Sequence, residues 1–202
     1  MTDTALTPPD HTVPTAFTRA QLDWLPWLAP LAVEAMTERH MASLVDAARV
    51  KSPYFRLLAR DPDALEARTR TDKDIFYNAD AGLPRAEREL AAAATSRFNG
   101  CLYCASVHAR HAATYSKREA DVQRLLDAGV TADLGERWNA IVAASVALTA
   151  TPSAFGLEHV DRLRRAGLDD LAIADVIHAA AFFNWANRLM LSLGEPAVAT
   201  AP

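Results

Sequence analysis

The chain has 202 residues, half of them hydrophobic, and a formal net charge of −4 from 21 Lys and Arg against 25 Asp and Glu. This length suits one domain with a sizeable core, and the mild acidity without any basic block argues against a nucleic-acid partner. No stretch has the pattern of a membrane span or a secretion signal, so we expect a cytoplasmic protein without a membrane partner.

The N-terminal part predicts an arm followed by a domain. Residues 1–16 are rich in Thr, Pro and Asp, which predicts a flexible or loosely draped arm. Residues 17–202 then form a single domain, for which abundant Ala, Leu and Arg with only seven Gly predict an all-α fold. Phe17 to Leu31 contains two Pro, which forbid a long helix, and two Trp, which we expect to pack on the body or on a neighbouring subunit.

Three helical stretches follow in the first half of the chain. Thr37–Val50 is the first. Ser52 caps the second, which begins at Pro53, and Asp61 caps the third, which covers Pro62–Tyr77. We expect the charged residues of the third helix to form a solvated face; they are Glu66, Arg68, Arg70, Asp72 and Lys73.

A helical hairpin comes next and holds both cysteines of the chain. One helix begins near Pro84 and runs to a break at Asn99-Gly100, and a second runs from Cys101 to about Tyr115. The C-x-x-C pair Cys101 and Cys104 therefore lies in the first turn of a helix, where unpaired backbone N–H groups and the helix dipole stabilise a thiolate. In a cytoplasmic chain a lone C-x-x-C is more often redox-active than structural.

Helix geometry predicts which side chains of this hairpin meet. The two cysteines share one helix face with His108 and His111. His108 lies one turn after Cys104 and can exchange a proton with its thiol. Once the helices fold back on each other, Glu89 lies at nearly the same depth as His108. His111 is a further candidate as a supporting group of the pocket, or is merely buried.

Further helices fill the rest of the chain. They are a helix capped by Ser116 and ended by Gly129, a long one over Leu134–Leu148, a short one over Leu157–Arg165, and a last one from Asp169 or Asp170 to about Leu193. The last helix is apolar nearly all round, which predicts burial, partly in a subunit contact. We expect its His178 in the core or an interface, and Asn184, Asn187 and Arg188 to satisfy each other or a subunit contact.

Glu89, eleven residues, C-x-x-C, three residues and His108 form a spacing that resembles the motif of the alkylhydroperoxidase D-like family, which shares its fold with carboxymuconolactone decarboxylases. Residues 30–194 resemble the longer "peroxidase-related" members more loosely. The resemblance implies a helical bundle with the C-x-x-C at the N-terminus of a central helix. It departs at Tyr103, which stands where the best-known member has a proton-relaying histidine. Tyr103 is not a base near neutral pH, and either lines the pocket or packs in the core.

The resemblance implies a thiol-dependent peroxidase whose partners are a hydroperoxide and a dithiol reductant, either a protein or a small molecule. His108, backed by Glu89, takes the proton of Cys104, whose thiolate cleaves the peroxide bond; Cys101 then closes a disulfide on the sulfenic acid. No haem, flavin or metal is implied. The family also implies a homo-oligomer: a trimer, a hexamer or a dimer.

Other interpretations stay open. The cysteines could be a buried pair without function, or part of a zinc site. Against zinc, Cys101 and His111 lie roughly 15 Å apart along one helix, whereas zinc ligands lie within about 2.3 Å of the metal. A non-catalytic redox sensor or a disulfide oxidoreductase would use the same dithiol, and a decarboxylase-like lyase would share the fold.

Overall fold

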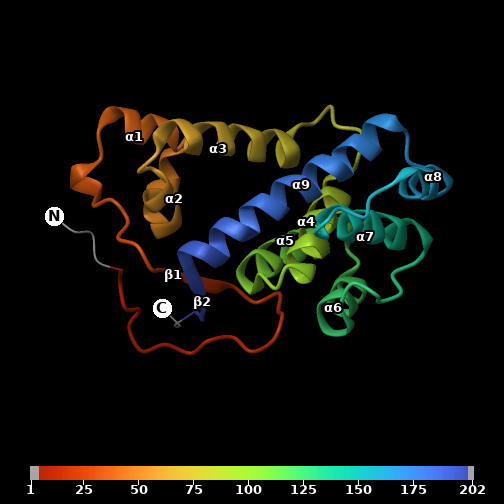
Figure 1. Ribbon diagram of the computed structural model, residues 1–202, viewed down its shortest axis with the longest axis horizontal. Helices are drawn as coiled ribbons and strands as arrows, with labels where there is room; N and C mark the ends of the chain where they lie inside the picture. The colour runs from red at the N-terminus through yellow and green to blue at the C-terminus, as the bar shows by residue number, and fades with distance from the viewer. Residues whose placement is uncertain (1–4, 200–202) are drawn as a thin grey trace.

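The structure, a computed structural model, describes residues 5–199. Over these residues it is a helical bundle with one two-stranded sheet (Figure 1). The all-α class is confirmed, and the small sheet was not predicted. In chain order the elements are β1 (Leu22–Pro26), the 3₁₀ helix η1 (Val33–Ala35), α1 (Glu38–Ser43), the 3₁₀ helix η2 (Ala47–Lys51), α2 (Pro53–Leu58), α3 (Pro62–Tyr77), α4 (Arg85–Phe98), α5 (Leu102–Ser116), α6 (Glu119–Ala128), α7 (Glu136–Thr149), α8 (Leu157–Arg165), α9 (Asp170–Leu193) and β2 (Gly194–Val198).

Helix α4 lies at the centre of the fold and buries small side chains. It packs against α5, α7 and α9, and its residues 91–94 are four consecutive alanines without exposed surface. Alanine favours the helix and lets neighbouring helices approach closely. Three of these alanines join Leu90, Ile141 and Val176 in the main hydrophobic cluster.

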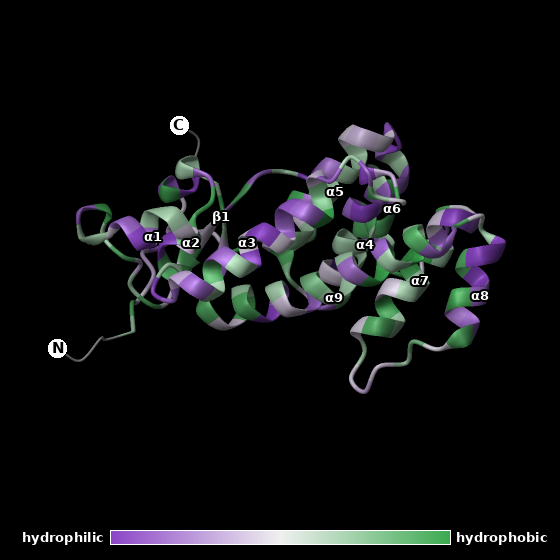
Figure 2. Ribbon diagram, turned by 90° about the horizontal axis from the view of Figure 1, so that it is seen from above, coloured by the Kyte–Doolittle hydropathy of each residue, from purple (hydrophilic) through white to green (hydrophobic). Residues whose placement is uncertain are grey.

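Helix α9, with 24 residues, crosses the molecule between α3 on one side and α4 and α7 on the other (Figure 1). Its Phe183 and Met190 join Phe76 of α3 in a second hydrophobic cluster that includes both cysteines. Helix α8 lies at one end of the molecule, where it alternates hydrophilic and hydrophobic residues (Figure 2) and buries Leu163. Within residues 5–199, no helix is long and apolar enough to cross a membrane.

The sheet ties the two ends of the domain together. Strands β1 and β2 pair antiparallel, with Leu22 opposite Val198 and Pro26 opposite Gly194. Trp24 of β1 is buried, and its indole N–H donates to the Met190 carbonyl at 3.3 Å. The expectation that the Trp-containing segment packs on the body is confirmed for Trp24, in a strand rather than an irregular arm.

The predicted arm lies against this sheet where the structure describes it. Residues 5–16 contain no helix or strand, but Leu6 N–H donates to the Trp27 carbonyl and Val198 N–H donates to the Thr12 carbonyl. Residues 1–4 of the arm and 200–202 of the predicted domain lie outside the described residues. The division into a flexible arm over 1–16 and a domain over 17–202 stays a prediction.

Several predicted boundaries are confirmed. Helix α4 begins directly after Pro84, and α8 has the predicted bounds. Asp61 and Asp169 accept hydrogen bonds as caps of α3 and α9. Ser52 precedes α2 as predicted, but its side chain makes no capping hydrogen bond.

Other predictions were wrong, for local reasons. The stretch 37–50 is interrupted because Val45 adopts a φ of 62°, which a helix cannot contain. Ser116 is the last residue of α5 rather than a cap; its hydroxyl accepts from Arg118 N–H before α6 begins. Helix α9 leaves His178 and Trp185 exposed, because one of its faces has no partner within the described chain. His178 is therefore not in the core, and its alternative placement in an interface stays a prediction. The expected subunit contact of α9 stays a prediction.

The substitution Gly194→Ala is expected to destabilise the fold. Gly194 has an extended φ of 178°, so the backbone tolerates a side chain. An added Cβ would, however, lie 2.3 Å from the Leu25 carbonyl oxygen and 2.4 Å from Cζ2 of Trp24. Separating the strands to relieve this overlap is expected to lower the unfolding free energy by roughly 1–3 kcal/mol, or about 2–4 °C in Tm per kcal/mol.

Thermal denaturation followed by circular dichroism measures this effect. Val198→Ala, at an exposed position of the same strand, is the control and should shift Tm less. Equal melting temperatures for Gly194→Ala and the wild type would show that β1 and β2 do not need this close approach.

Candidate active site

The turn between α4 and α5 places the two cysteines at the start of a helix. Gly100 has a φ of +79°, a left-handed conformation that glycine adopts without strain, and it reverses the chain after Asn99. Cys101 is the N-cap residue of α5, and Cys104 lies in the first turn. Because α5 runs back along α4, side chains from the two helices meet at matching depths.

Glu89 of α4 and His108 of α5 form a buried pair. Their side chains meet at 2.6 Å between Glu89 Oε2 and His108 Nδ1, and the residues are 1 % and 8 % exposed. Arg85 Nε donates to the other carboxylate oxygen at 3.2 Å. Burial raises the pKa of Glu89, but the hydrogen bond from His108 and the nearby positive charges outweigh it, so the pKa lies below its usual value. Glu89 is therefore an ionised carboxylate.

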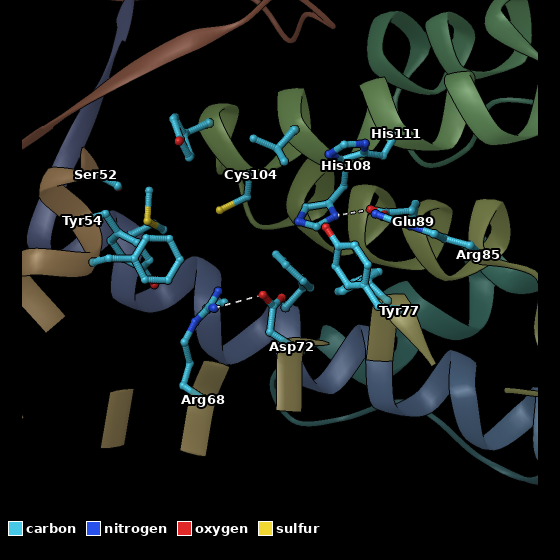
Figure 3. A pocket seen from close by; sticks show the side chains of 17 residues that line it. Ser52, Tyr54, Arg68, Asp72, Tyr77, Arg85, Glu89, Cys104, His108 and His111 are labelled. Atoms are coloured by element: carbon cyan, nitrogen blue, oxygen red, sulfur yellow. Dashed lines mark hydrogen bonds and ion pairs between the residues drawn. The ribbon is translucent and has the colours of Figure 1, made fainter. Parts of the chain in front are cut away.

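This pairing fixes the role of each nitrogen of His108. An ionised carboxylate can only accept hydrogen bonds, so Nδ1 carries the proton and donates it to Glu89. In the neutral ring Nε2 is then the free acceptor. The ring packs against Phe183 at 4.0 Å and Phe76 at 5.2 Å between centroids, and it lies between Glu89 and Cys104 (Figure 3).

Cys101 and Cys104 are free thiols with opposite pKa shifts. Burial, then the contact with Cys101, raises the pKa of Cys104 well above its usual value. A hydrogen bond from the Cys104 thiol lowers the pKa of Cys101 in spite of burial. The expected stabilisation of a thiolate by the helix N-terminus is therefore not found at Cys104 in the resting state, where loss of solvent outweighs it.

A cavity of about 200 Å³ opens onto Cys104 and the buried pair. It is bounded by aromatic rings of α2, α3 and α9 and by polar groups at both ends (Figure 3). The predicted site residues Glu89, Tyr103, Cys104, His108 and His111 all line it. Cys101 does not, although it is in hydrogen-bond contact with Cys104. The structure thus brings the six predicted residues together: five line the cavity, and Cys101 is buried next to Cys104 without lining it.

Tyr103 and His111 both line this cavity. Burial raises the pKa of Tyr103, so its hydroxyl stays protonated and is no base near neutral pH. Burial lowers the pKa of His111, and its ring stacks at 6.2 Å on Tyr115. Within residues 5–199, no group of three or more His, Cys, Asp or Glu side chains is arranged to hold a metal ion.

Two residues expected on a solvated face line the cavity instead. Arg68 and Asp72 of α3 are paired at 3.2 Å, and Arg68 is 9 % exposed. Their spacing carried a signal, because Leu65, Arg68, Asp72 and Phe76 recur at helical intervals of three and four. Leu65 and Phe76 are buried, so the stripe that faces the core includes the charged pair.

Asn187 of α9 is a further residue beside the dithiol. It is fully buried, donates to Ser96 Oγ at 3.0 Å and accepts from Asn99 Nδ2 at 3.1 Å. Its amide also contacts Cys104 and acts to lower the pKa of that thiol. Asn184 accepts from Arg188 Nε at 3.3 Å, as expected, whereas Asn187 bonds to residues of α4 and its C-cap.

A comparison with protein families matches residues 62–147 to the carboxymuconolactone decarboxylase family. The match runs from the start of α3 into α7 and contains the whole α4–α5 hairpin. It confirms the resemblance inferred from the spacing of Glu89, the cysteines and His108. No curated protein matches the chain significantly.

Solved structures share the fold. An uncharacterized peroxidase-related protein from Ralstonia eutropha JMP134, described as an alkylhydroperoxidase AhpD core, aligns with a TM-score of 0.68 and 23% identity over 81% of this chain and 87% of that chain. A peroxidase-related protein from Silicibacter sp. TM1040 gives 0.66 and 21% over 95% and 94%. The debrominase Bmp8 gives 0.65 and 20% over 81% and 88%. At these identities the likeness concerns the fold.

The substitution Glu89→Gln is expected to remove a pH-dependent part of the stability. Because the pKa of Glu89 is lower in the fold than in the unfolded chain, its ionised form stabilises the fold above the ordinary pKa. That contribution is lost as the pH falls through the lowered folded-state pKa. Between about pH 6 and about pH 3, the wild type should lose more unfolding free energy than Glu89→Gln.

Urea denaturation at both pH values measures the difference. Glu136→Gln removes an exposed acid from the first turn of α7 and should follow the wild type. A Glu89→Gln protein with the wild-type pH slope would mean that the carboxylate is not stabilised by its neighbours.

Proposed function

We propose that this chain, whose residues 62–147 match the carboxymuconolactone decarboxylase family, is a thiol-dependent hydroperoxidase that uses Cys104 as its nucleophile. The observation that carries the proposal is the row of Glu89, His108 and Cys104 along one wall of a cavity, with the second thiol directly behind. A carboxylate paired with an imidazole, and a dithiol at the same cavity, are the groups that peroxide reduction by thiols needs.

His108 acts as the base in this proposal. The raised pKa of Cys104 keeps its thiol protonated at neutral pH, so the thiolate forms only when a neighbour takes the proton. Nε2 of His108 accepts it, and Glu89 stabilises the resulting imidazolium through Nδ1–H. Arg85 keeps Glu89 oriented from the opposite side.

The reaction then runs in two balanced steps. The Cys104 thiolate attacks the outer oxygen of the hydroperoxide, so an S–O bond forms and the O–O bond breaks, giving a sulfenic acid and an alkoxide that His108 protonates. Cys101 attacks the sulfenic sulfur, which forms a disulfide and releases water after proton transfer. An external dithiol, protein or small molecule, reduces the disulfide and is itself oxidised.

A second candidate function is reductive dehalogenation. The observation in its favour is that one structural neighbour is a debrominase, whose Cys-to-Ala variant forms a complex with 2,3,4-tribromopyrrole, together with the aromatic walls of the cavity here. A thiolate would take bromine from a protonated ring, giving the debrominated ring and a sulfenyl bromide. Cys101 would then displace bromide and form the same disulfide.

Steady-state assays distinguish these functions. Consumption of a hydroperoxide with a dithiol reductant supports the peroxidase, and bromide release from a brominated pyrrole supports the dehalogenase. Single turnover of both without steady-state consumption would favour a redox sensor. Two free thiols that persist after stoichiometric peroxide would contradict the dithiol cycle.

The two cysteines are expected to differ in reactivity. Cys101→Ser should react with one equivalent of peroxide and hold a sulfenic acid on Cys104, because the base and the cavity adjoin that thiol. Cys104→Ser should react far more slowly, since the remaining thiol, Cys101, does not line the cavity. Dimedone labelling with peptide mapping reports both. Equal labelling rates in the two variants would reverse the assignment.

His108→Gln is expected to slow peroxide reduction by about 10²–10⁴-fold, the usual effect of losing a general base. Glu89→Gln should slow the reaction less, because His108 remains as the base and only the carboxylate that orients it is lost. The matched control is His111→Gln, which removes the other histidine of the cavity. Stopped-flow measurement of Cys104 oxidation gives the rates; similar losses in His108→Gln and His111→Gln would contradict a specific role for His108.

A further inference from the structure

The cavity has a second polar end that peroxide reduction does not use. Arg68 and Asp72 of α3 and Tyr54 of α2 line it. Figure 3 shows the Arg68 side chain pointing from α3 into the space beside Cys104, away from the Glu89–His108 pair. Cys104 thus lies between two polar ends, one occupied by the base and one by a guanidinium.

Two donors at this end have no partner. Among the residues that the structure describes, neither the Arg68 Nε–H nor the Tyr54 O–H has an acceptor, although both atoms are buried. The residues themselves are 9 % and 7 % exposed. The Tyr54 hydroxyl lies beside the Arg68 guanidinium, whose charge and hydrogen bond act to lower the pKa of Tyr54. Buried donors are normally satisfied, so a pair left open in a cavity indicates a place for an acceptor.

The charge at this end is positive. Asp72 is the carboxylate of the cluster, and it pairs with two guanidinium groups: Arg68 at 3.2 Å and Arg49 at 3.6 Å. One positive charge is therefore uncompensated. The other carboxylate of the cavity, Glu89, is held by Arg85 and His108 at the opposite end. Burial raises the pKa of Tyr54 to about 12, so its hydroxyl remains a donor and adds no negative charge.

Arg68 is also held in place before any ligand arrives. Its guanidinium lies 5.3 Å from the ring centroid of Phe182, 5.4 Å from that of Phe55 and 6.0 Å from that of Tyr54. These cation–π contacts and the pair with Asp72 fix the direction of Nε. A fixed donor binds its acceptor without a further loss of side-chain freedom.

We propose that Arg68 and Tyr54 form a subsite for the carboxylate of a small organic acid. One carboxylate oxygen accepts from Arg68 Nε and the other from Tyr54 Oη, a charge-assisted arrangement that a neutral group cannot match. The aromatic rings hold the apolar part. Resting on the proposed function, this arrangement places the hydroperoxide of an acidic substrate at Cys104.

Binding of benzoate and of its neutral analogue benzamide tests the subsite without any reaction. Calorimetry on the reduced protein is expected to show benzoate binding at least about tenfold more tightly, as a charge-assisted hydrogen bond allows. Arg68→Gln should abolish the preference and Tyr54→Phe should reduce it. Arg70→Gln, an exposed arginine on the same helix paired with Glu66, should retain it. Equal binding of the two ligands to the wild type would overturn the proposal, as would a preference that survives Arg68→Gln in a protein with wild-type circular dichroism.

The kinetic counterpart compares cumene hydroperoxide with its para-carboxylate. The ratio of kcat/KM for the acid to that for the neutral peroxide should fall about tenfold or more in Arg68→Gln and stay at the wild-type value in Arg70→Gln. A protein that prefers benzoate but consumes neither peroxide would keep the subsite and refute the peroxidase. A protein that consumes both peroxides with equal kcat/KM in wild type and Arg68→Gln would keep the peroxidase and refute the subsite.

Discussion

The close packing of α4 against α5 is the constraint on which the site depends. Both helices bury small side chains, which lets their axes lie close together. These alanines have no exposed surface: Ala91 to Ala94 in α4, and Ala105, Ala109 and Ala112 in α5. This short separation lets Glu89 reach His108 at 2.6 Å while both are buried. A buried carboxylate is tolerated only with partners, and Arg85 and His108 supply them. Larger side chains between the helices would therefore separate Glu89 from His108 and leave the Glu89 carboxylate buried without its partner.

The remainder of the chain shapes the space in front of this hairpin. Helices α2, α3 and α9 come from distant parts of the sequence and contribute Tyr54, Phe76 and Phe183 to the cavity wall. The β1–β2 sheet fixes the end of α9 and the segment before α2, since Trp24 of β1 bonds to the Met190 carbonyl. The reactive groups are thus local in sequence, whereas the shape and polarity of the cavity depend on tertiary contacts.

This division explains what the sequence could predict. The Glu89–His108 contact follows from helix rise and the break at Gly100, which are local properties, and the family match covers the same hairpin. The strand at Trp24 could not be predicted, because its partner lies at the other end of the chain and both strands are short and contain proline. Arg68 looked like a surface charge, because its burial depends on rings from α2 and α9 that meet it only in the fold. The order of the two thiol pKa values likewise depends on burial.

The lowered pKa of Cys101 and the raised pKa of Cys104 fit the proposed cycle better than two equally acidic thiols would. Cys101 has the lowered pKa but does not line the cavity, so a peroxide does not meet the more acidic thiol first. Cys104 lines the cavity but carries the proton, so in the proposed cycle its thiolate forms when His108 accepts that proton beside a bound substrate. Once Cys104 is oxidised, Cys101 supplies the thiol that attacks the sulfenic acid in the second step of the cycle. Cys101 needs no access to solvent for this, because Cys104 is its hydrogen-bond partner. In that cycle, burial separates the roles of nucleophile and resolving thiol, which the C-x-x-C spacing alone leaves interchangeable.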